Sequence, residues 1–152
     1  MNAKRLENNI ISSKLSEYSR IAKLQIPSAG WIAAIRSALN MTLSQLGTRM
    51  GITRQAVSKM EKREAMGNIT LNNLRAVAES LDMHLVYAIV PKEGTLEEYV
   101  EKRALQLARE IVMGSNQQMR LEDQAVADPE VEETLRQLAA EYTRTIDRQL
   151  WD

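Results

Sequence analysis

The side chains best suited to contact another molecule lie on one face of a short helix that is predicted to start at Arg54. That face carries Arg54, Gln55, Ser58 and Lys59. The opposite face carries Val57 and Met60, which recur at helical spacing and are expected to pack. Cations, an amide and a hydroxyl recognise a partner by charge and hydrogen bonds. The chemistry predicted for this face is therefore binding.

Catalysis finds little support in the sequence. His84 is the only histidine, cysteine is absent, and no glycine-rich phosphate loop is present. The acidic residues of the C-terminal half show no metal-ligand spacing and are expected on solvated helix faces. We expect a protein that is not an enzyme and that has no cofactor and no metal site.

Two short helices joined at Gly51 form the centre of the pattern. Thr42 with Gln45 makes a capping box for a helix that starts at Leu43. Gly51 can adopt the left-handed conformation that ends this helix, and Thr53 caps the helix that starts at Arg54. The spacing predicts a helix-turn-helix.

Charge is distributed unevenly along the 152 residues, although the net charge is zero. Residues 1–70 hold 11 Lys and Arg against 4 Asp and Glu, a balance of +7, and residues 71–152 hold 9 against 16, a balance of −7. The basic half contains the helix-turn-helix and suits a phosphate-rich partner. With no long apolar stretch and no cysteine, we expect a bacterial-type cytoplasmic protein with no membrane segment.

The N-terminal part is expected to be helical. Residues 1–26 form a predicted amphipathic arm, which could cover the core or lie along DNA, and the covering role is favoured. After Pro27, Ser28 is expected to cap a helix from about Ala29 to Asn40, with Trp31 in the core. Beyond the helix-turn-helix, Thr70 caps a further amphipathic helix.

Residues 83–90, M-H-L-V-Y-A-I-V, favour a single β-strand closed by Pro91. No second strand is evident, so its backbone groups need a partner. We expect the strand to pair with its own copy across a homodimer; a buried extended segment within one chain is the alternative. The residues assigned to this dimer strand are His84, Leu85, Val86, Tyr87, Ala88 and Ile89.

The C-terminal part, residues 92–152, is predicted to be a helical hairpin. Thr95 with Glu98 is a capping box for its first long helix. The helical pattern continues through Met119 and Leu121 to Val126, and Asp128-Pro129 starts the last helix. The fold class is therefore mainly α: a five-helix helix-turn-helix domain over 27–91, including the terminal strand, followed by a hairpin that offers a dimer or partner surface.

The stretch M-T-L-S-Q-L-G-T-R-M-G-I-T-R-Q-A-V-S-K-M-E, residues 41–61, resembles the XRE helix-turn-helix of phage repressors and Cro. The resemblance implies that the second helix enters the major groove of double-stranded DNA. Base reading then falls to Arg54, Gln55, Ser58 and Lys59, and phosphate contacts to Thr42, Gln45, Thr53, Lys62 and Arg63. Arg36 and Glu61 match a structural ion pair of that family, and Gly47 stands where the family usually has alanine.

From about Ser28 onward the chain is similar to the family called mobile mystery protein A. The segments that carry this resemblance are G-W-I-A-A-I-R-S-A-L-N-M-T-L-S-Q-L, L-V-Y-A-I-V-P, M-R-L-E-D-Q-A-V and L-W-D. The resemblance implies that the operon also encodes a partner with a Fic domain. It further implies that this protein is an antitoxin or autorepressor, associated with the nucleoid when bound to a palindromic operator. The alternative is a protein-interaction module that masks a partner through its C-terminal helices, with DNA binding secondary.

Overall fold

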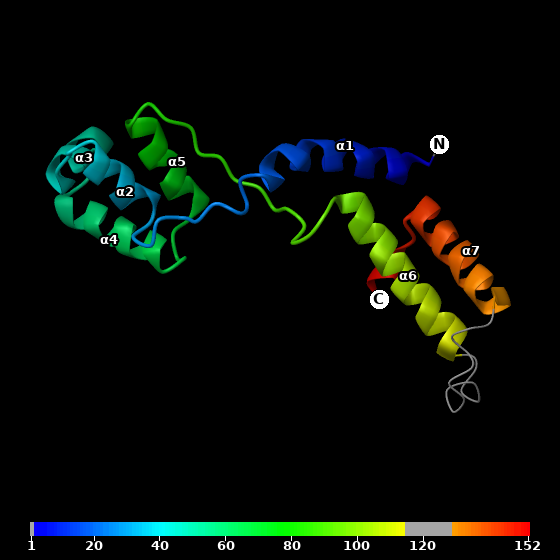
Figure 1. The fold of residues 1–152 in the computed structure, drawn as a ribbon. Coiled ribbons are helices and arrows are strands. Elements are labelled where there is room, and N and C mark those ends of the chain that lie inside the picture. Colours follow the sequence, from blue (N-terminus) through cyan, green and yellow to red (C-terminus); the bar gives the residue numbers. More distant parts are fainter. Residues whose placement is uncertain (1, 115–128) are drawn as a thin grey trace. The chain divides into compact units, whose positions relative to one another are not determined.

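The computed structural model describes residues 2–114 and 129–152. Its contacts divide the chain into two compact units, shown in Figure 1. The central unit is Leu24–Tyr87, and the terminal unit combines Met1–Lys23 with Ala88–Asp152. The helical continuation predicted through Met119 and Leu121 to Val126, and the cap predicted at Asp128, lie outside the described residues.

Four helices make up the central unit: α2 (Trp31–Ala38), α3 (Leu43–Met50), α4 (Arg54–Ala65) and α5 (Leu71–Ser80). Each of the last three starts at a threonine whose hydroxyl accepts a hydrogen bond from the amide three residues later. The turn between α3 and α4 contains Gly51, whose φ of 68° is the left-handed conformation predicted there. Five helices were predicted for this domain, and its described residues contain four.

The core of the central unit consists of one buried residue from each helix and one that directly follows α5. They are Ile32, Leu46, Val57, Val77 and Leu81. Val57 and Leu46 are completely buried, so α3 and α4 are fixed to each other through their inner faces. The apolar stripe predicted on α4 is therefore the packed face, and its polar face is left outward.

The start of α2 differs from the prediction. The helix begins at Trp31 with Gly30 as its N-cap, so Ser28 does not cap it. Gly30 has a φ of 85°, which a residue with a side chain rarely adopts, and it supplies no capping hydrogen bond of its own. Trp31, predicted in the core, is 51% exposed. The periodic pattern placed this residue on the inner face, but Trp31 is the first residue of α2 and lies outside the core cluster, to which α2 contributes Ile32.

The terminal unit contains α1 (Ala3–Ser19), α6 (Leu96–Gly114), α7 (Pro129–Thr145) and the short 3₁₀ helix η3 (Arg148–Trp151). Helices α6 and α7 lie side by side and run in opposite directions as a helical hairpin (Figure 1). The capping box at the start of α6 is present, with Thr95 N donating to Glu98 Oε2 at 2.9 Å. Val100, Ala104 and Leu150 form the centre of this core.

The chain turns back at Ile146, where φ is 48°, and η3 then packs on α6. A β-branched residue in the left-handed region carries backbone strain, and Ile146 stays there because its side chain packs against the core of the terminal unit. Arg103 of α6 donates to the carbonyls of Leu150 and Asp152. Trp151 stacks on Tyr99 with ring centroids 5.8 Å apart.

Helix α1 packs on α6 and α7 through a face that is not its apolar one. Its least exposed positions recur at Asn8, Ser12, Leu15 and Ser19, and Ser12 is its only buried residue. Of the predicted apolar stripe, Leu15 alone lies on this face; Leu6, Ile10, Ile11, Tyr18 and, after the helix, Ile21 are between 37% and 55% exposed. The expectation that this stripe packs inward to cover a core is therefore wrong.

Polar contacts hold α1 in place instead. Ser12 Oγ donates to Glu97 Oε2 at the start of α6. Burial raises the pKa of Glu97, but the hydrogen bonds from Ser12 and neighbouring groups outweigh that effect and leave the pKa below its ordinary value. The side-chain Oδ1 of Asn2 caps α1 by accepting from Lys4 N, and its Nδ2 donates to the backbone carbonyl of Thr145 at the end of α7.

The strand predicted over residues 83–90 is not present. Met83–Val90 has no regular secondary structure, and the part of the chain that the structure describes contains no strand. The amide of Met83 still bonds to Ala78 O, and within the described ranges no further backbone–backbone hydrogen bond follows until α6. A strand needs a neighbour with which to form a ladder, and none lies within these residues. Val86, Tyr87 and Ile89 are exposed.

Candidate nucleic-acid interface

The predicted base-reading residues occupy the first two turns of α4. Arg54, Gln55 and Lys59 are exposed, and Ser58 is half-buried. Val57, between them in sequence, is fully buried and holds this end of the helix to the core. Within residues 2–114 and 129–152, Arg54 and Lys59 have no ion-pair partner. The polar face of α4 therefore presents free cations on a backbone that is fixed from behind.

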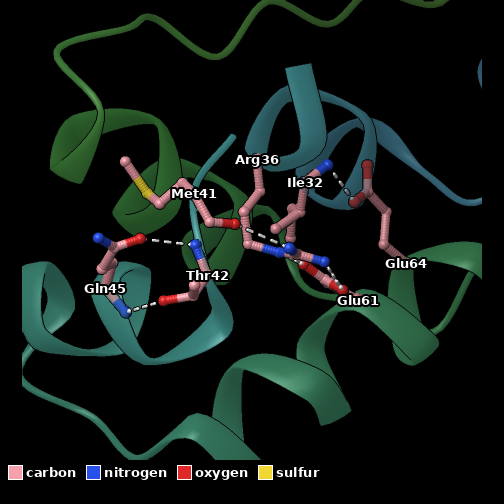
Figure 2. Close-up of polar contacts among 7 residues, drawn as sticks. All are labelled: Ile32, Arg36, Met41, Thr42, Gln45, Glu61 and Glu64. Atoms are coloured by element: carbon pink, nitrogen blue, oxygen red, sulfur yellow. Dashed lines mark hydrogen bonds and ion pairs between the residues drawn. The ribbon is translucent and has the colours of Figure 1, made fainter. Parts of the chain in front are cut away.

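The candidate phosphate contacts Thr42, Gln45 and Thr53 all take part in helix caps. Gln45 N donates to Thr42 Oγ1 at 3.1 Å, and Thr42 N donates to Gln45 Oε1 at 2.8 Å (Figure 2). Thr53 Oγ1 accepts from Ala56 N at 3.1 Å. Because the caps use the side-chain oxygens as acceptors, the groups left over are donors: two hydroxyl hydrogens and the Gln45 amide NH₂. Donors at a helix N-terminus are suited to a phosphate.

Lys62 and Arg63 extend this basic surface at the other end of α4. Both are exposed and lie in the last turn of the helix. Neither forms an ion pair with another residue in the part of the chain that the structure describes. Cations at a helix C-terminus also interact favourably with the helix dipole, so this placement is compatible with folding before any partner binds.

Arg36 and Glu61 form a bidentate ion pair behind α4. Arg36 Nε lies 2.5 Å from Glu61 Oε1, and Arg36 Nη2 lies 3.1 Å from Glu61 Oε2. Both side chains are mostly buried, with exposed fractions of 18% and 14%. The hydrogen bond to Glu61 raises the pKa of Arg36 against the opposing effect of burial, and the charge of Glu61 adds to the rise. The guanidinium is therefore a permanent cation held in fixed geometry.

The third donor of Arg36 reaches the turn that precedes α3. Nη1 donates to Met41 O at 2.9 Å, next to the Thr42 cap (Figure 2). One side chain thus joins the last turn of α2, the middle of α4 and the start of α3. Nothing in the sequence pattern indicates this contact with Met41, because it depends on where the turn places a backbone carbonyl.

Glu64 is a site residue that the sequence reasoning missed. Its Oε1 accepts from Trp31 N at 2.7 Å and its Oε2 accepts from Ile32 N at 2.9 Å. Figure 2 shows the contact with Ile32 on the same side of α2 as the Arg36–Glu61 pair. The signal that could have found it is indirect: a glutamate one turn after Glu61, and a helix whose N-cap is a glycine without a capping side chain.

The predicted dimer strand is not part of this surface. His84, Leu85, Val86, Tyr87, Ala88 and Ile89 lie in the extended segment that follows α5, and His84 is exposed. No group of His, Asp and Glu side chains in the described part of the chain could hold a metal ion. None of the described helices combines the length and apolar content needed to span a bilayer.

A family model for the helix-turn-helix matches residues 32–87. These residues form a helix-turn-helix domain of the XRE type. The match runs from the second residue of α2 past the end of α5 and includes every predicted reading and phosphate residue. No curated protein and no solved structure matches the chain.

The XRE-type domain is a DNA-binding domain, in which the second helix of the motif lies in the major groove. Helix α4 is that second helix here. The central unit that contains the domain holds 7 Lys and Arg against 4 Asp and Glu, a balance of +3, and the terminal unit has a balance of −3. The charge imbalance seen along the sequence is therefore smaller when counted by unit, but its sign still favours DNA at the XRE-type domain.

Proposed function

We propose that this protein is a sequence-specific transcriptional regulator that binds double-stranded DNA through α4. The observation that carries the proposal is the orientation of this helix. Val57, Glu61 and Glu64 contact the rest of the domain. On the other face, Arg54, Gln55 and Lys59 are exposed. A helix fixed on one side with unpaired donors on the other suits direct readout of base edges.

The roles follow from the chemistry of each side chain. Arg54 and Lys59 donate to guanine O6 and N7, Gln55 pairs with adenine N6 and N7, and Ser58 contacts either. Around them, the donors of Thr42, Gln45 and Thr53 and the cations of Lys62 and Arg63 contact phosphates on both sides of the groove. Base contacts then provide sequence preference, and phosphate contacts provide most of the affinity.

A homodimer on a palindromic operator completes the proposal. One α4 covers a half-site, and two-fold symmetry supplies the second. The segment His84–Ile89 supports this: its backbone amides form no backbone hydrogen bond with the described residues, and Val86, Tyr87 and Ile89 are exposed. Pairing with the same segment of a second copy would give these groups a ladder and cover the apolar side chains.

The biological setting follows from the resemblance to mobile mystery protein A. In that setting the protein is a cytoplasmic autorepressor or antitoxin, associated with the nucleoid when bound to DNA, and its operon partner has a Fic domain. The α6–α7 hairpin is the surface that would contact such a partner. In the alternative, this contact is the main function and DNA binding is secondary.

The test is a double substitution, Arg54→Ala with Gln55→Ala, in the full chain. Each base contact contributes about 1–3 kcal/mol, so losing two should weaken binding to the protein's own promoter by at least about thirtyfold. The chain offers a matched control, because Arg136 and Gln137 are also adjacent and exposed, on α7. The corresponding double alanine variant removes the same groups and should bind normally.

Binding is measured by fluorescence anisotropy and footprinting, and folding by circular dichroism. An unchanged footprint in the Arg54→Ala, Gln55→Ala double variant would contradict the proposal. If that variant lost its footprint but regulated its operon normally, the alternative based on partner masking would be favoured.

A further inference from the structure

We infer that Glu64 positions the reading helix, and that the protein's choice of DNA sequence depends on this residue. The inference rests on the proposed function. Glu64 contacts no reading residue and lies at the opposite end of α4 from them. Its effect would be exerted through the orientation of the helix axis.

The contact exists because α2 cannot cap itself. The amides of Trp31 and Ile32 are among the first in the helix and have no intrahelical partner. Gly30 has no side chain to offer, and its φ of 85° excludes the usual capping residues. The carboxylate of Glu64 takes both amides, at 2.7 and 2.9 Å, in a charge-assisted pair at the positive end of the α2 dipole.

Gly30 and Glu64 fit each other closely. A Cβ at residue 30 would lie 2.7 Å from both Glu64 Cδ and Oε2. The carboxylate therefore occupies the space that any other residue at the N-cap would need. This fit makes the contact specific to one geometry of α4 against α2.

Glu61 and Glu64 hold α4 at two points. Glu61 binds Arg36 in the last turn of α2, and Glu64 binds the first turn of the same helix. The packing of Val57 holds the first part of α4, and the two carboxylates, one turn apart, constrain the direction of its C-terminal part. We call the contacts of Glu61 and Glu64 with α2 the clamp. Lys62 and Arg63 lie between the two carboxylates in sequence and are exposed, so the clamp also orients the cations proposed for phosphate contact.

A small change in the direction of the α4 axis near Glu64 causes a large displacement of the reading residues at the other end of the helix. Glu64 lies ten residues from Arg54, about 15 Å along the helix at 1.5 Å per residue. A tilt of roughly 5° over that length moves the far end by roughly 1 Å, enough to spoil bidentate contacts with a base. Phosphate contacts tolerate such a shift better, because long flexible cations make them. Loss of the clamp should therefore reduce sequence preference more than general DNA affinity.

The experiment compares Glu64→Gln and Glu64→Ala with Glu79→Ala in the full chain. Glu79 is exposed on α5, and among the described residues its side chain forms no ion pair, so its variant controls for loss of a negative charge from the same unit. The probes are a DNA duplex selected by the wild-type protein from a random pool and an unrelated duplex of equal length. Hydrogen exchange of the Trp31 and Ile32 amides reports whether the clamp is intact.

In Glu64→Ala, we expect those two amides to lose protection while the Val57 and Val77 amides keep theirs. Affinity for the selected duplex should fall about tenfold, with a change of less than about twofold on the unrelated duplex. Glu64→Gln keeps one acceptor and should fall between Glu64→Ala and the wild type, and Glu79→Ala should keep the wild-type ratio.

Two results would overturn the inference. The first is a folded Glu64→Ala variant with unprotected Trp31 and Ile32 amides and an unchanged ratio of the two affinities. The second is wild-type protein in which these amides are already unprotected. If the wild type itself selects no duplex from the pool, the proposed function fails, which is a different outcome. Should Glu64→Ala not fold, the same comparison is made with Glu64→Gln.

Discussion

Gly47 sets how closely α3 approaches the turn that follows it. The residue is buried, and a Cβ there would lie 2.7 Å from Ile52 O, a backbone atom that cannot move without moving the turn. The resemblance to phage repressors implies alanine at this position. The chain therefore has a tighter turn at this point than that family pattern requires.

We predict that Gly47→Ala destabilises the protein. Alanine gains about 1 kcal/mol of helix propensity over glycine, but the clash with a backbone oxygen costs more, as overpacking typically does by about 1–3 kcal/mol. The net effect should be a loss of free energy of unfolding, measured by urea denaturation.

Gly114 is the control for this prediction. It is also helical, but a Cβ there meets nothing within 4 Å, so Gly114→Ala should be neutral or mildly stabilising. If both alanine variants were equally stable, the close approach of α3 to the turn would not matter, and the geometry described for Gly47 would be wrong.

Among the helices, α4 has two ends with different tasks in the proposed function. The first two turns present Arg54, Gln55 and Lys59, which would discriminate between bases, and the last turn presents Lys62 and Arg63, which would contact phosphates. These tasks depend differently on salt. A phosphate contact releases counterions, whereas a base contact does so much less.

We therefore predict that Lys62→Ala weakens binding to all DNA sequences by a similar factor. The slope of log affinity against log salt concentration should become shallower by about one. Lys102 on α6 is equally a surface lysine, and Lys102→Ala should leave the slope unchanged. A Lys62→Ala variant that changed sequence preference but kept its slope would contradict this division of α4.

Helix ends that depend on capping or turn residues close in sequence were predictable from the sequence. Thr42 with Gln45, Gly51 and Thr53 each act within a few residues of themselves, and the structure has the caps and the turn as predicted. The polar face of α4 was also predictable, because periodicity determines which side of a short helix can pack. Its role as a reading face stays a prediction.

The predictions that were wrong concern features that depend on contacts between residues distant in sequence. The cap of α2 comes from Glu64, 33 residues after Trp31, so Ser28 was the wrong choice. The apolar stripe of α1 predicted an inward face, but Ser12 and its polar neighbours pack instead, because Glu97 and the end of α7 offer hydrogen bonds. A β-prone composition over residues 83–90 did not make a strand without a neighbour.

At the scale of the whole molecule, the proposed homodimer needs a surface that brings two copies of α4 together. Met83–Val90 is the best candidate, because it combines exposed apolar side chains with a backbone that, after the Met83 amide, has no backbone hydrogen bond to the residues that the structure describes. Such a segment is costly in a monomer and becomes favourable when a second copy covers it.

We predict that Val86→Pro converts dimers to monomers in sedimentation equilibrium, because proline removes a backbone donor from the ladder. Operator affinity should fall with it, since each half-site is then bound alone. Val86→Thr keeps the donor and the β-branched shape, and should remain dimeric. If the proline variant stayed dimeric, a different surface would have to carry the symmetry.

The two tryptophans lie in different units. Trp31 begins α2 in the central unit, half exposed, with its amide on Glu64, and Trp151 stacks on Tyr99 in the terminal unit. The chain therefore carries one natural fluorophore for each unit. Replacing either indole by phenylalanine leaves a single emitter, so the unfolding of the DNA-binding half and of the hairpin half can be followed separately and without labels.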